Sequence, residues 1–159
     1  MSGQPPVSLA LQAIREPDFA DAVIVSIPPS TTGLSTDPGW WAELVFSVRT
    51  APKWVVALLG LRQLLVGLIG VKRADRTVFD ITTVEGTEAL IHTHDDHLDF
   101  AAGVAIDIDQ RLLTVTTAVR FNNWRGRVYF IPVSVLHGPV TRSMASRAVS
   151  IATSESDGA

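Results

Sequence analysis

Cysteine is absent from this chain of 159 residues, and its absence removes several classes of function at once. Without thiols the protein has no disulfide framework, no thiolate nucleophile and no cysteine-ligated zinc site. Positive charge is also scarce, because 13 lysines and arginines stand against 16 acidic residues and leave a net charge of −3. No basic stripe is available for a phosphate backbone, so we expect no nucleic-acid partner. A reducing, cytoplasmic location agrees with the missing cysteines.

A signal peptide and a clear membrane span are missing as well. Residues Met1 to Leu11 lack the basic region, apolar stretch and small-residue cleavage site of a secretory leader. The stretch from Trp54 to Val71 is nearly long enough to cross a bilayer, but Arg62 and Gln63 stand at its middle. An arginine at that depth costs roughly 2.5–3.5 kcal/mol on insertion scales, so we interpret the stretch as a buried helix.

Hydrophobic side chains are abundant, making up 47% of the sequence, and the mean hydropathy is +0.27. This content lets one domain bury a core without metals or disulfides. We place that domain at residues 17–153, after an extension at 1–16 that can add a strand near Pro6 to Ile14, and before a disordered tail at 154–159. The hydropathy is high for a sheet with one face open to water, so we also expect a homodimer.

The first half of the chain predicts one strand and two helices. Residues Asp21 to Pro28 are rich in β-branched side chains and end in proline, which is typical of a strand that leaves into a loop. Asp37 supplies an N-cap before a first-turn proline, and this predicts a helix from Pro38 to Arg49. The same signal recurs at 50–52 and predicts a second helix that ends near Gly70.

Short runs rich in Val, Thr, Ile and Phe follow, separated by turn residues, and they indicate an antiparallel meander. The predicted strands are Arg76–Val84, Thr87–Thr93, His97–Asp107, Arg111–Phe121 and Gly126–Ser134. A last helix is predicted to open at Gly138-Pro139. Its apolar residues recur at near-helical spacing and should lie on the sheet; they are Val140, Met144, Ala148 and Ile151.

This order of elements indicates an α+β fold. A strand, two helices, a run of antiparallel strands and a final helix follow one another in START-like and polyketide-cyclase-like domains, whose helix-grip architecture the chain resembles. The resemblance implies a curved antiparallel sheet and a long C-terminal helix that together enclose a cavity. Our six strands are one fewer than that fold usually has.

Several segments carry a second resemblance. They are Pro52-Lys53-Trp54-Val55 with Leu58-Leu59 and Leu61-Arg62, then Asp95-Asp96-His97-Leu98-Asp99-Phe100, then Thr116-Thr117-Ala118-Val119 through Asn123, Gly126-Arg127 and Tyr129-Phe130, and finally His137. In this order they resemble motifs of a bacterial family called domain of unknown function 2867, among them its D-D-x-H-L-D-F-R signature. The likeness runs from about Pro17 to Ser150.

One departure from the family pattern bears on the ligand. Ala101 stands where the signature leads us to expect arginine, so if that arginine binds an anionic group in relatives, the ligand here is different or neutral. Members of the family sometimes sit beside nicotinamide-binding domains, but this chain has no G-x-G-x-x-G sequence. We expect no cofactor.

A cluster of titratable residues before and within the third predicted strand raises the question of a metal site. Its members are His92, His94, Asp95, Asp96, His97 and Asp99. On extended chain His92 and His94 share one face, whereas His97 and Asp99 share another, so a closed ligand set would need further residues. We favour a solvated turn with ordinary hydrogen bonds and expect no metal.

His97 and Asp99 are instead candidates for a general acid/base pair, because a carboxylate beside imidazole sets its tautomer and raises its basicity. The alternative is a polar pair on a solvated face. The inward face of the strand decides between them, and we favour its apolar set, Leu98, Phe100, Ala102, Val104 and Ile106, for packing on the last helix. The opposite set, with Ala101, Gly103 and Ala105 beside the pair, would leave room for a ligand.

His137 is the third candidate for acid/base chemistry. At a helix start, the positive end of the helix dipole would disfavour the imidazolium and keep the ring neutral, as suits a base. The alternative is a loop histidine bonded to backbone. We expect the ligand to contact Thr116, Arg120, Tyr129, Phe100 and Met144. Three tryptophans, Trp40, Trp41 and Trp54, are expected in the core or at a dimer contact.

Three functions remain open from the sequence. The first is a domain that binds a small, mostly apolar or amphipathic molecule. The second is an enzyme of the cyclase, isomerase or hydrolase type that uses His97, Asp99 or His137 on such a molecule. The third is a structural or regulatory dimer without a ligand. No motif fixes a reaction, so these functions rest on analogy of fold.

Overall fold

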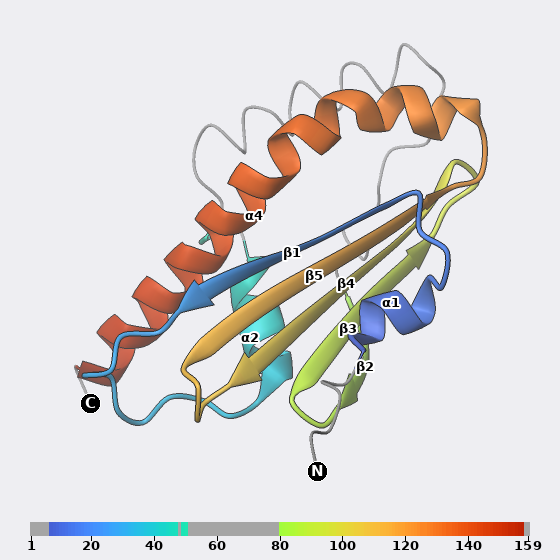
Figure 1. Ribbon diagram of the computed structural model, residues 1–159. Helices are drawn as coiled ribbons and strands as arrows, with labels where there is room; N and C mark the ends of the chain where they lie inside the picture. Colours follow the sequence, from blue (N-terminus) through green and yellow to red (C-terminus); the bar gives the residue numbers. More distant parts are fainter. Residues whose placement is uncertain (1–6, 48, 51–79, 158–159) are drawn as a thin grey trace.

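The computed structural model describes residues 7–47, 49–50 and 80–157 of the chain (Figure 1). In order, its elements are α1 (Leu9–Ala13), β1 (Phe19–Ser26), α2 (Pro38–Val45), β2 (Ile81–Glu85), β3 (Glu88–His94), β4 (Leu98–Asp107), β5 (Leu112–Phe121) and α4 (Trp124–Asp157). The helix predicted to end near Gly70, the start of the strand predicted from Arg76, and Trp54 lie outside the described residues. The fold is α+β, as predicted.

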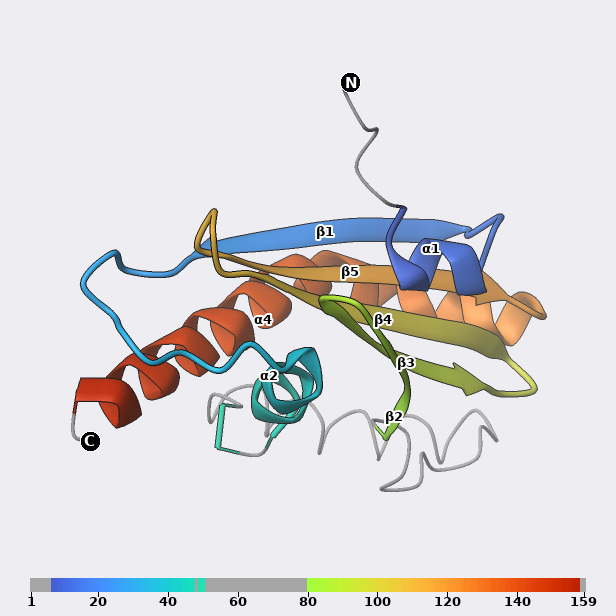
Figure 2. The same cartoon turned by 90° about the horizontal axis from the view of Figure 1, so that it is seen from below.

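The strands form one antiparallel, curved sheet in the order β1-β5-β4-β3-β2 (Figures 1 and 2). Strands β2 to β5 follow one another as a meander, as the turn residues predicted, and Gly86 turns the β2–β3 hairpin with φ of 57°. Strand β1 lies at one edge of the sheet and pairs with β5, with Phe19 opposite Val119 and Ser26 opposite Leu112. The three inner strands, β5, β4 and β3, are therefore paired on both edges.

The prediction of a strand at Gly126–Ser134 is wrong, because these residues belong to α4. The helix begins at Trp124, not at Gly138, because the Asn123 side chain accepts a hydrogen bond from the Gly126 N–H at 3.1 Å and caps the first turn. The β-branched residues of this segment lower helix propensity only slightly, so packing decides its conformation. At its other end α4 extends to Asp157, so residues 154–157 of the predicted tail are helical, and the last two residues lie outside the described part of the chain.

Two prolines lie inside α4. Pro132 and Pro139 each remove a backbone donor and crowd the preceding turn, which explains why the long helix bends as it crosses the sheet (Figure 1). Pro139, taken from the sequence as a first-turn proline, therefore marks a bend within the helix.

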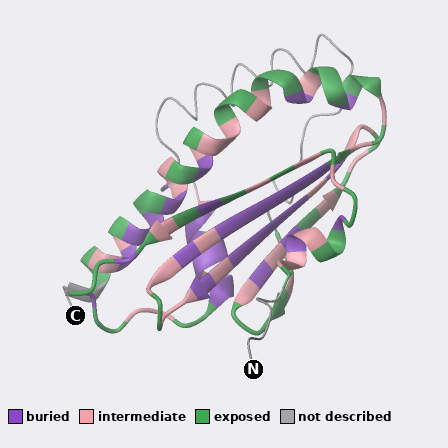
Figure 3. Ribbon diagram, viewed as in Figure 1, coloured by how far each residue is buried: buried purple, intermediate pink, exposed green. Residues whose placement is uncertain are grey.

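The main core lies between the sheet, α2 and α4 (Figure 3). Asp37 caps α2 as predicted, accepting from the Gly39 N–H at 2.8 Å, although the helix ends at Val45 and not at Arg49. Trp41 is fully buried and donates its indole N–H to the Ser35 carbonyl at 2.8 Å. The buried side chains of this core include Ile27, Val45, Ala89, Val104, Ile106, Leu113, Val115, Ala145, Ala148 and Val149.

The opposite face of the sheet carries α1, where the sequence allowed an extra strand near Pro6 to Ile14. Ser8 caps this short helix, and Glu88 of β3 accepts hydrogen bonds from the Ser8 hydroxyl and from the Leu9 N–H. These bonds hold Ala10 and Ile14 against a second, smaller core with Ala101 and Ala118. Leu9–Ala13 satisfy their backbone groups as a capped helix, so the described residues from 7 onward add no strand before β1.

The inward face of β4 is the apolar one, as favoured from the sequence. Val104 and Ile106 join the main core under α2 and α4. Ala101 packs against α1, and a Cβ on Gly103 would collide with the Glu88 carboxylate on that same side. The small residues therefore make room for α1 and its Glu88 tether.

Candidate functional site

The β3–β4 turn and the start of α4 are joined by two asparagines. The Asn122 N–H donates to the His97 carbonyl at 2.9 Å, and its side chain donates to the Asp95 carbonyl at 2.8 Å. The Asn123 side chain donates to the Asp96 carbonyl at 2.9 Å and lies 3.0 Å from His97 Nδ1. Two of the segments that carried the family resemblance, the acidic signature and the asparagine–glycine segment, thus meet in space.

Gly126 completes this junction. A Cβ at Gly126 would overlap the carbonyl oxygen of His97, so only glycine lets the first turn of α4 lie against the turn. The structure thus explains why residue 123 is an asparagine and residue 126 is a glycine. His97 is held at this junction through its backbone carbonyl and through its imidazole ring.

Asp99 is the centre of a polar cluster on the end of β4. Its neighbours across the sheet are His94 on β3 and Arg120 on β5, which the strand register places opposite it. Arg120 Nη2 lies 2.7 Å from Asp99 Oδ2, and Asn122 Nδ2 donates to Oδ1 at 3.0 Å. His94 Nδ1 also contacts Oδ1. His94 and Arg120 reach the carboxylate because the antiparallel register aligns three strands at this point, and Asn122 reaches it from just beyond the end of β5.

The environment of Asp99 favours its charged form. Its side chain is only 6% exposed, and this burial opposes ionisation. Hydrogen bonds from Asn122, Arg120 and His94 outweigh the burial and hold the pKa of Asp99 below its ordinary value. His94, with a side chain 75% exposed, therefore presents an imidazole to solvent that a buried carboxylate orients.

The predicted pair of His97 and Asp99 is not formed within the described residues. His97 interacts with Asn123, whereas the histidine beside Asp99 is His94. The prediction counted spacing along one strand, but β4 begins only at Leu98, and the partner of Asp99 comes from the neighbouring strand. Cross-strand neighbours depend on register, which one-strand spacing does not contain.

His137 lies in the interior of α4 and not at a helix start, so the predicted influence of a helix N-terminus on its ring is wrong. Its Nδ1 lies 3.0 Å from Oδ2 of Asp21 on β1, with the two side chains 15% and 26% exposed. The alternative, a loop histidine bonded to backbone, is also wrong. The helix and the edge strand are thus joined by a histidine–carboxylate pair.

The surroundings of this pair are aromatic. Phe19 stacks edge-on against the His137 ring, with ring centroids 5.5 Å apart, and against Phe130 at 4.9 Å. Asp21 Oδ1 is buried and accepts no hydrogen bond from the described residues. A buried carboxylate oxygen without a donor is costly, and in native structures such an atom marks strain, a catalytic role, or a bound water or ion. Sequence reasoning missed Asp21, although its even spacing from Phe19 and Val23 in the strand was a usable signal.

The residues predicted to contact a ligand lie on opposite faces of the sheet. Thr116 lies opposite Gly103 on the α1 side, and Arg120 is engaged by Asp99. Met144 packs on the main core, on the α4 side, and Phe100 shares the inward face of β4. Tyr129 lies on α4, half-buried. One ligand cannot reach both faces, so these residues do not form one binding site.

The histidine and aspartate cluster holds no metal-like arrangement. Among residues 7–47, 49–50 and 80–157, no group of three or more His, Asp or Glu side chains is placed to bind a metal ion. The His92 side chain is exposed and does not contact Asp99, and the His92 backbone N–H donates to the Thr82 hydroxyl at 3.1 Å.

In the described part of the chain, none of the helices has the length and apolar character needed to span a membrane.

Comparison with known proteins gives one match. No curated protein and no solved structure matches the chain. A family model described as "Protein of unknown function (DUF2867)" matches residues 13–144, which include both sides of the Asn123 junction and the His137–Asp21 pair. This match spans well over half of the sequence and agrees with the resemblance carried by the motifs. The chain belongs to the DUF2867 family.

Proposed function

We propose that this protein is a helix-grip domain that binds a small, mostly apolar molecule at the His137–Asp21 pair, between β1 and α4. The order of elements and the long helix across a curved sheet support the helix-grip assignment. The observation that carries the binding proposal is Asp21 Oδ1, a buried acceptor without a donor among the described residues. A ligand with a hydroxyl or amine would supply that donor.

The aromatic surroundings define the rest of the ligand. Phe19 and Phe130 border the pair, so an apolar body would replace water there while one polar group faces Asp21. Ala101, in place of the expected arginine, is covered by α1 on the other face of the sheet and offers no cation to the ligand. We expect a neutral or cationic molecule and a cytoplasmic location.

An acid/base enzyme is the second candidate, and the same pair favours it. Asp21 orients the His137 ring through Nδ1, which leaves Nε2 as the atom that can take or give a proton. The protein is a binding domain if it leaves the bound molecule intact and an enzyme if it converts that molecule. A ligand-free dimer, the third possibility, would need a water or a group of the second copy as the donor to Asp21 Oδ1.

The test is native mass spectrometry of the protein purified from its own host. We expect a bound small molecule on the wild type and its loss from Asp21→Asn, which keeps the shape of the side chain but removes its charge. The matched control is Asp109→Asn, an exposed carboxylate in the β4–β5 turn, which should retain the molecule. A wild type without bound mass, or Asp21→Asn with unchanged occupancy, would contradict the proposal.

The same preparation separates binding from catalysis. Incubation of the complex should leave both the mass and the chromatographic retention of the ligand unchanged if the protein is a carrier, since an isomerase would conserve the mass alone. Conversion of the ligand by wild type, with binding but no conversion by His137→Asn, would establish the acid/base enzyme instead.

A further inference from the structure

The outer face of the first half of α4 carries a continuous apolar stripe. Trp124, Val128, Ile131 and Val135 are 68%, 51%, 66% and 72% exposed. Their spacing of four, three and four residues places them along one side of the helix. We call these four residues the α4 stripe. A single exposed apolar side chain is ordinary, but four on the same side of one helix mark a contact surface.

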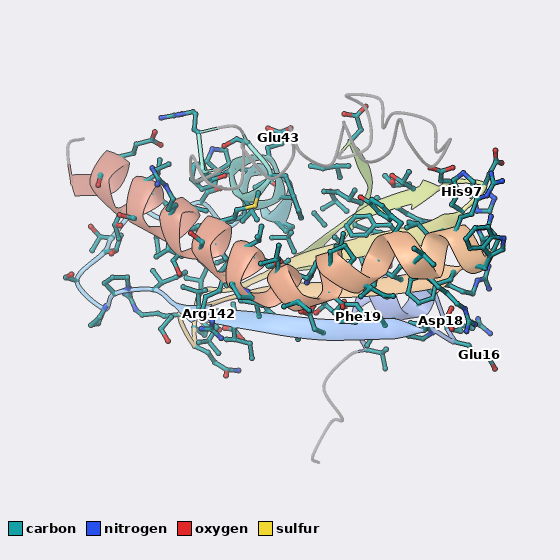
Figure 4. All side chains as sticks on the ribbon, turned by 90° about the horizontal axis from the view of Figure 1, so that it is seen from above. Glu16, Asp18, Phe19, Glu43, His97 and Arg142 are labelled. Atoms are coloured by element: carbon teal, nitrogen blue, oxygen red, sulfur yellow. The ribbon has the colours of Figure 1, made fainter. Side chains whose placement is uncertain are left out.

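The described part of the fold leaves the α4 stripe largely exposed. The side of α4 that packs on the sheet is formed by other residues, with Phe130 at one end and Ala145 and Ala148 in the main core. Figure 4 looks onto the outer side of the helix, in front of the sheet. Among the residues that the structure describes, none buries these four side chains, so a partner surface is the natural occupant of this side of the helix.

The charge of the helix identifies the kind of partner. From Trp124 to Ser154 the helix has four arginines and no acidic residue, although the whole chain is negative. Arg142 lies seven residues beyond Val135 and therefore continues the line of the stripe, and Figure 4 shows it on the helix beside β1. Arg125 stacks over the Trp124 ring, 5.7 Å from its centroid. Cations thus border the α4 stripe at both ends.

Arg127 is the least available of these cations, because its Nη2 lies 3.7 Å from Asp18 Oδ1. The contact is long and both groups are partly in solvent, so it screens Arg127 only weakly. The remaining arginines of the helix, Arg125, Arg142 and Arg147, are exposed.

We propose that the α4 stripe docks this protein on an anionic phospholipid surface. The apolar side chains would enter the boundary between headgroups and acyl chains, and the arginines would meet the phosphates. Trp124, at the end of the stripe, is the residue type that membrane interfaces favour. The helix would lie on the membrane without crossing it.

A second copy of the chain is the competing occupant, and the charges disfavour it. A two-fold contact pairs the same surface with itself, so the arginines that border one stripe would face those that border the other. Like charges placed opposite one another oppose association. An anionic lipid surface has the complementary charge and needs no matching shape.

The experiment is co-sedimentation of the full chain with vesicles. Phosphatidylcholine vesicles with about one third phosphatidylglycerol should bind it, and pure phosphatidylcholine vesicles should bind it about tenfold less. Ile131→Ser with Val135→Ser should lower binding about tenfold, and Arg125→Gln with Arg142→Gln should remove the preference for the anionic lipid. The matched control is Ile24→Ser, a residue of β1 that is 51% exposed and lies outside the α4 stripe.

Thermal melting of each variant checks that the fold is kept, and the arginine variant tests the proposal independently of the apolar one. The proposal is overturned if anionic vesicles do not bind the wild type, or if Ile24→Ser loses as much binding as the stripe variant. It is also overturned if the wild type sediments as a dimer that the stripe variant dissociates, because the stripe would then be a subunit interface.

Discussion

Asn123 Nδ2 lies 3.0 Å from Nδ1 of His97, and through this contact the first residue before α4 is held against the turn between β3 and β4. The same asparagine accepts from the Gly126 N–H, so one side chain both caps the helix and anchors it.

Replacing Gly126 with alanine should destabilise the protein by about 1–3 kcal/mol, because the new Cβ overlaps the His97 carbonyl oxygen and backbone must shift. Gly138→Ala is the matched change in the same helix, where a Cβ meets no atom within 4 Å. There the gain in helix propensity and the crowding before Pro139 oppose one another, so we expect a change within about 1 kcal/mol. Urea titration measures both, and equal effects would contradict the close contact.

Asp99→Asn should lower the free energy of unfolding at neutral pH by about 1–3 kcal/mol, since His94 and Arg120 lose their charged partner. The pKa of Asp99 is lowered in the folded protein, so its contribution is present above the unfolded pKa of about 3.9 and is lost as pH falls through the folded value. The wild type should therefore lose stability on acidification below about pH 5 more steeply than the variant. Parallel pH curves would refute this assignment, and exposed Asp109→Asn is the control.

Gly103→Ala should release α1 from the sheet. The added Cβ displaces the Glu88 carboxylate, which accepts from Ser8 and from the Leu9 N–H at 3.0 Å. We expect faster amide exchange at Ala10 and Ile14, with the main core unchanged, because these two residues belong to the separate core on that face. Glu88→Gln is the companion variant and should have a weaker effect of the same kind. Uniform loss of protection throughout the chain would instead mean that the two cores unfold together.

Trp41→Ala should cost about 3–5 kcal/mol, because the side chain is fully buried in the main core and its indole N–H is bonded to Ser35. Trp124→Ala is the same substitution at a residue that is 68% exposed, and it should change stability by about 0.5 kcal/mol or less. Guanidinium titration compares the two. A similar loss at both positions would show that Trp124 is covered by the folded chain, against the assignment of the α4 stripe.

Local signals in the sequence predicted much of the sheet. The strand from Leu112 to Phe121 and the one from Leu98 to Asp107 lie within one residue of their predicted bounds, because turn residues flank long runs of β-formers. The start of α2 was also readable, since Asp37 and Pro38 form a cap that needs no distant partner.

The candidate site was predicted only in part. Asp99 and His137 were identified from residue type and position, but the partners of both, His94 and Asp21, were not. His94 lies on β3 and Asp21 on β1, and the position of each strand depends on its pairing across the sheet. Spacing within one segment carries no such information.

The sequence by itself determined the α+β class, the absence of thiol chemistry, the antiparallel order of β2 to β5 and the cap of α2, because each follows from composition or from neighbours in the chain. Tertiary structure alone decided that residues 126–134 are helical. Their β-branched side chains suit a strand or a helix face almost equally, and the difference came from the contact of Gly126 with His97 across the fold. That contact exists only when the β3–β4 turn has folded beside the start of α4.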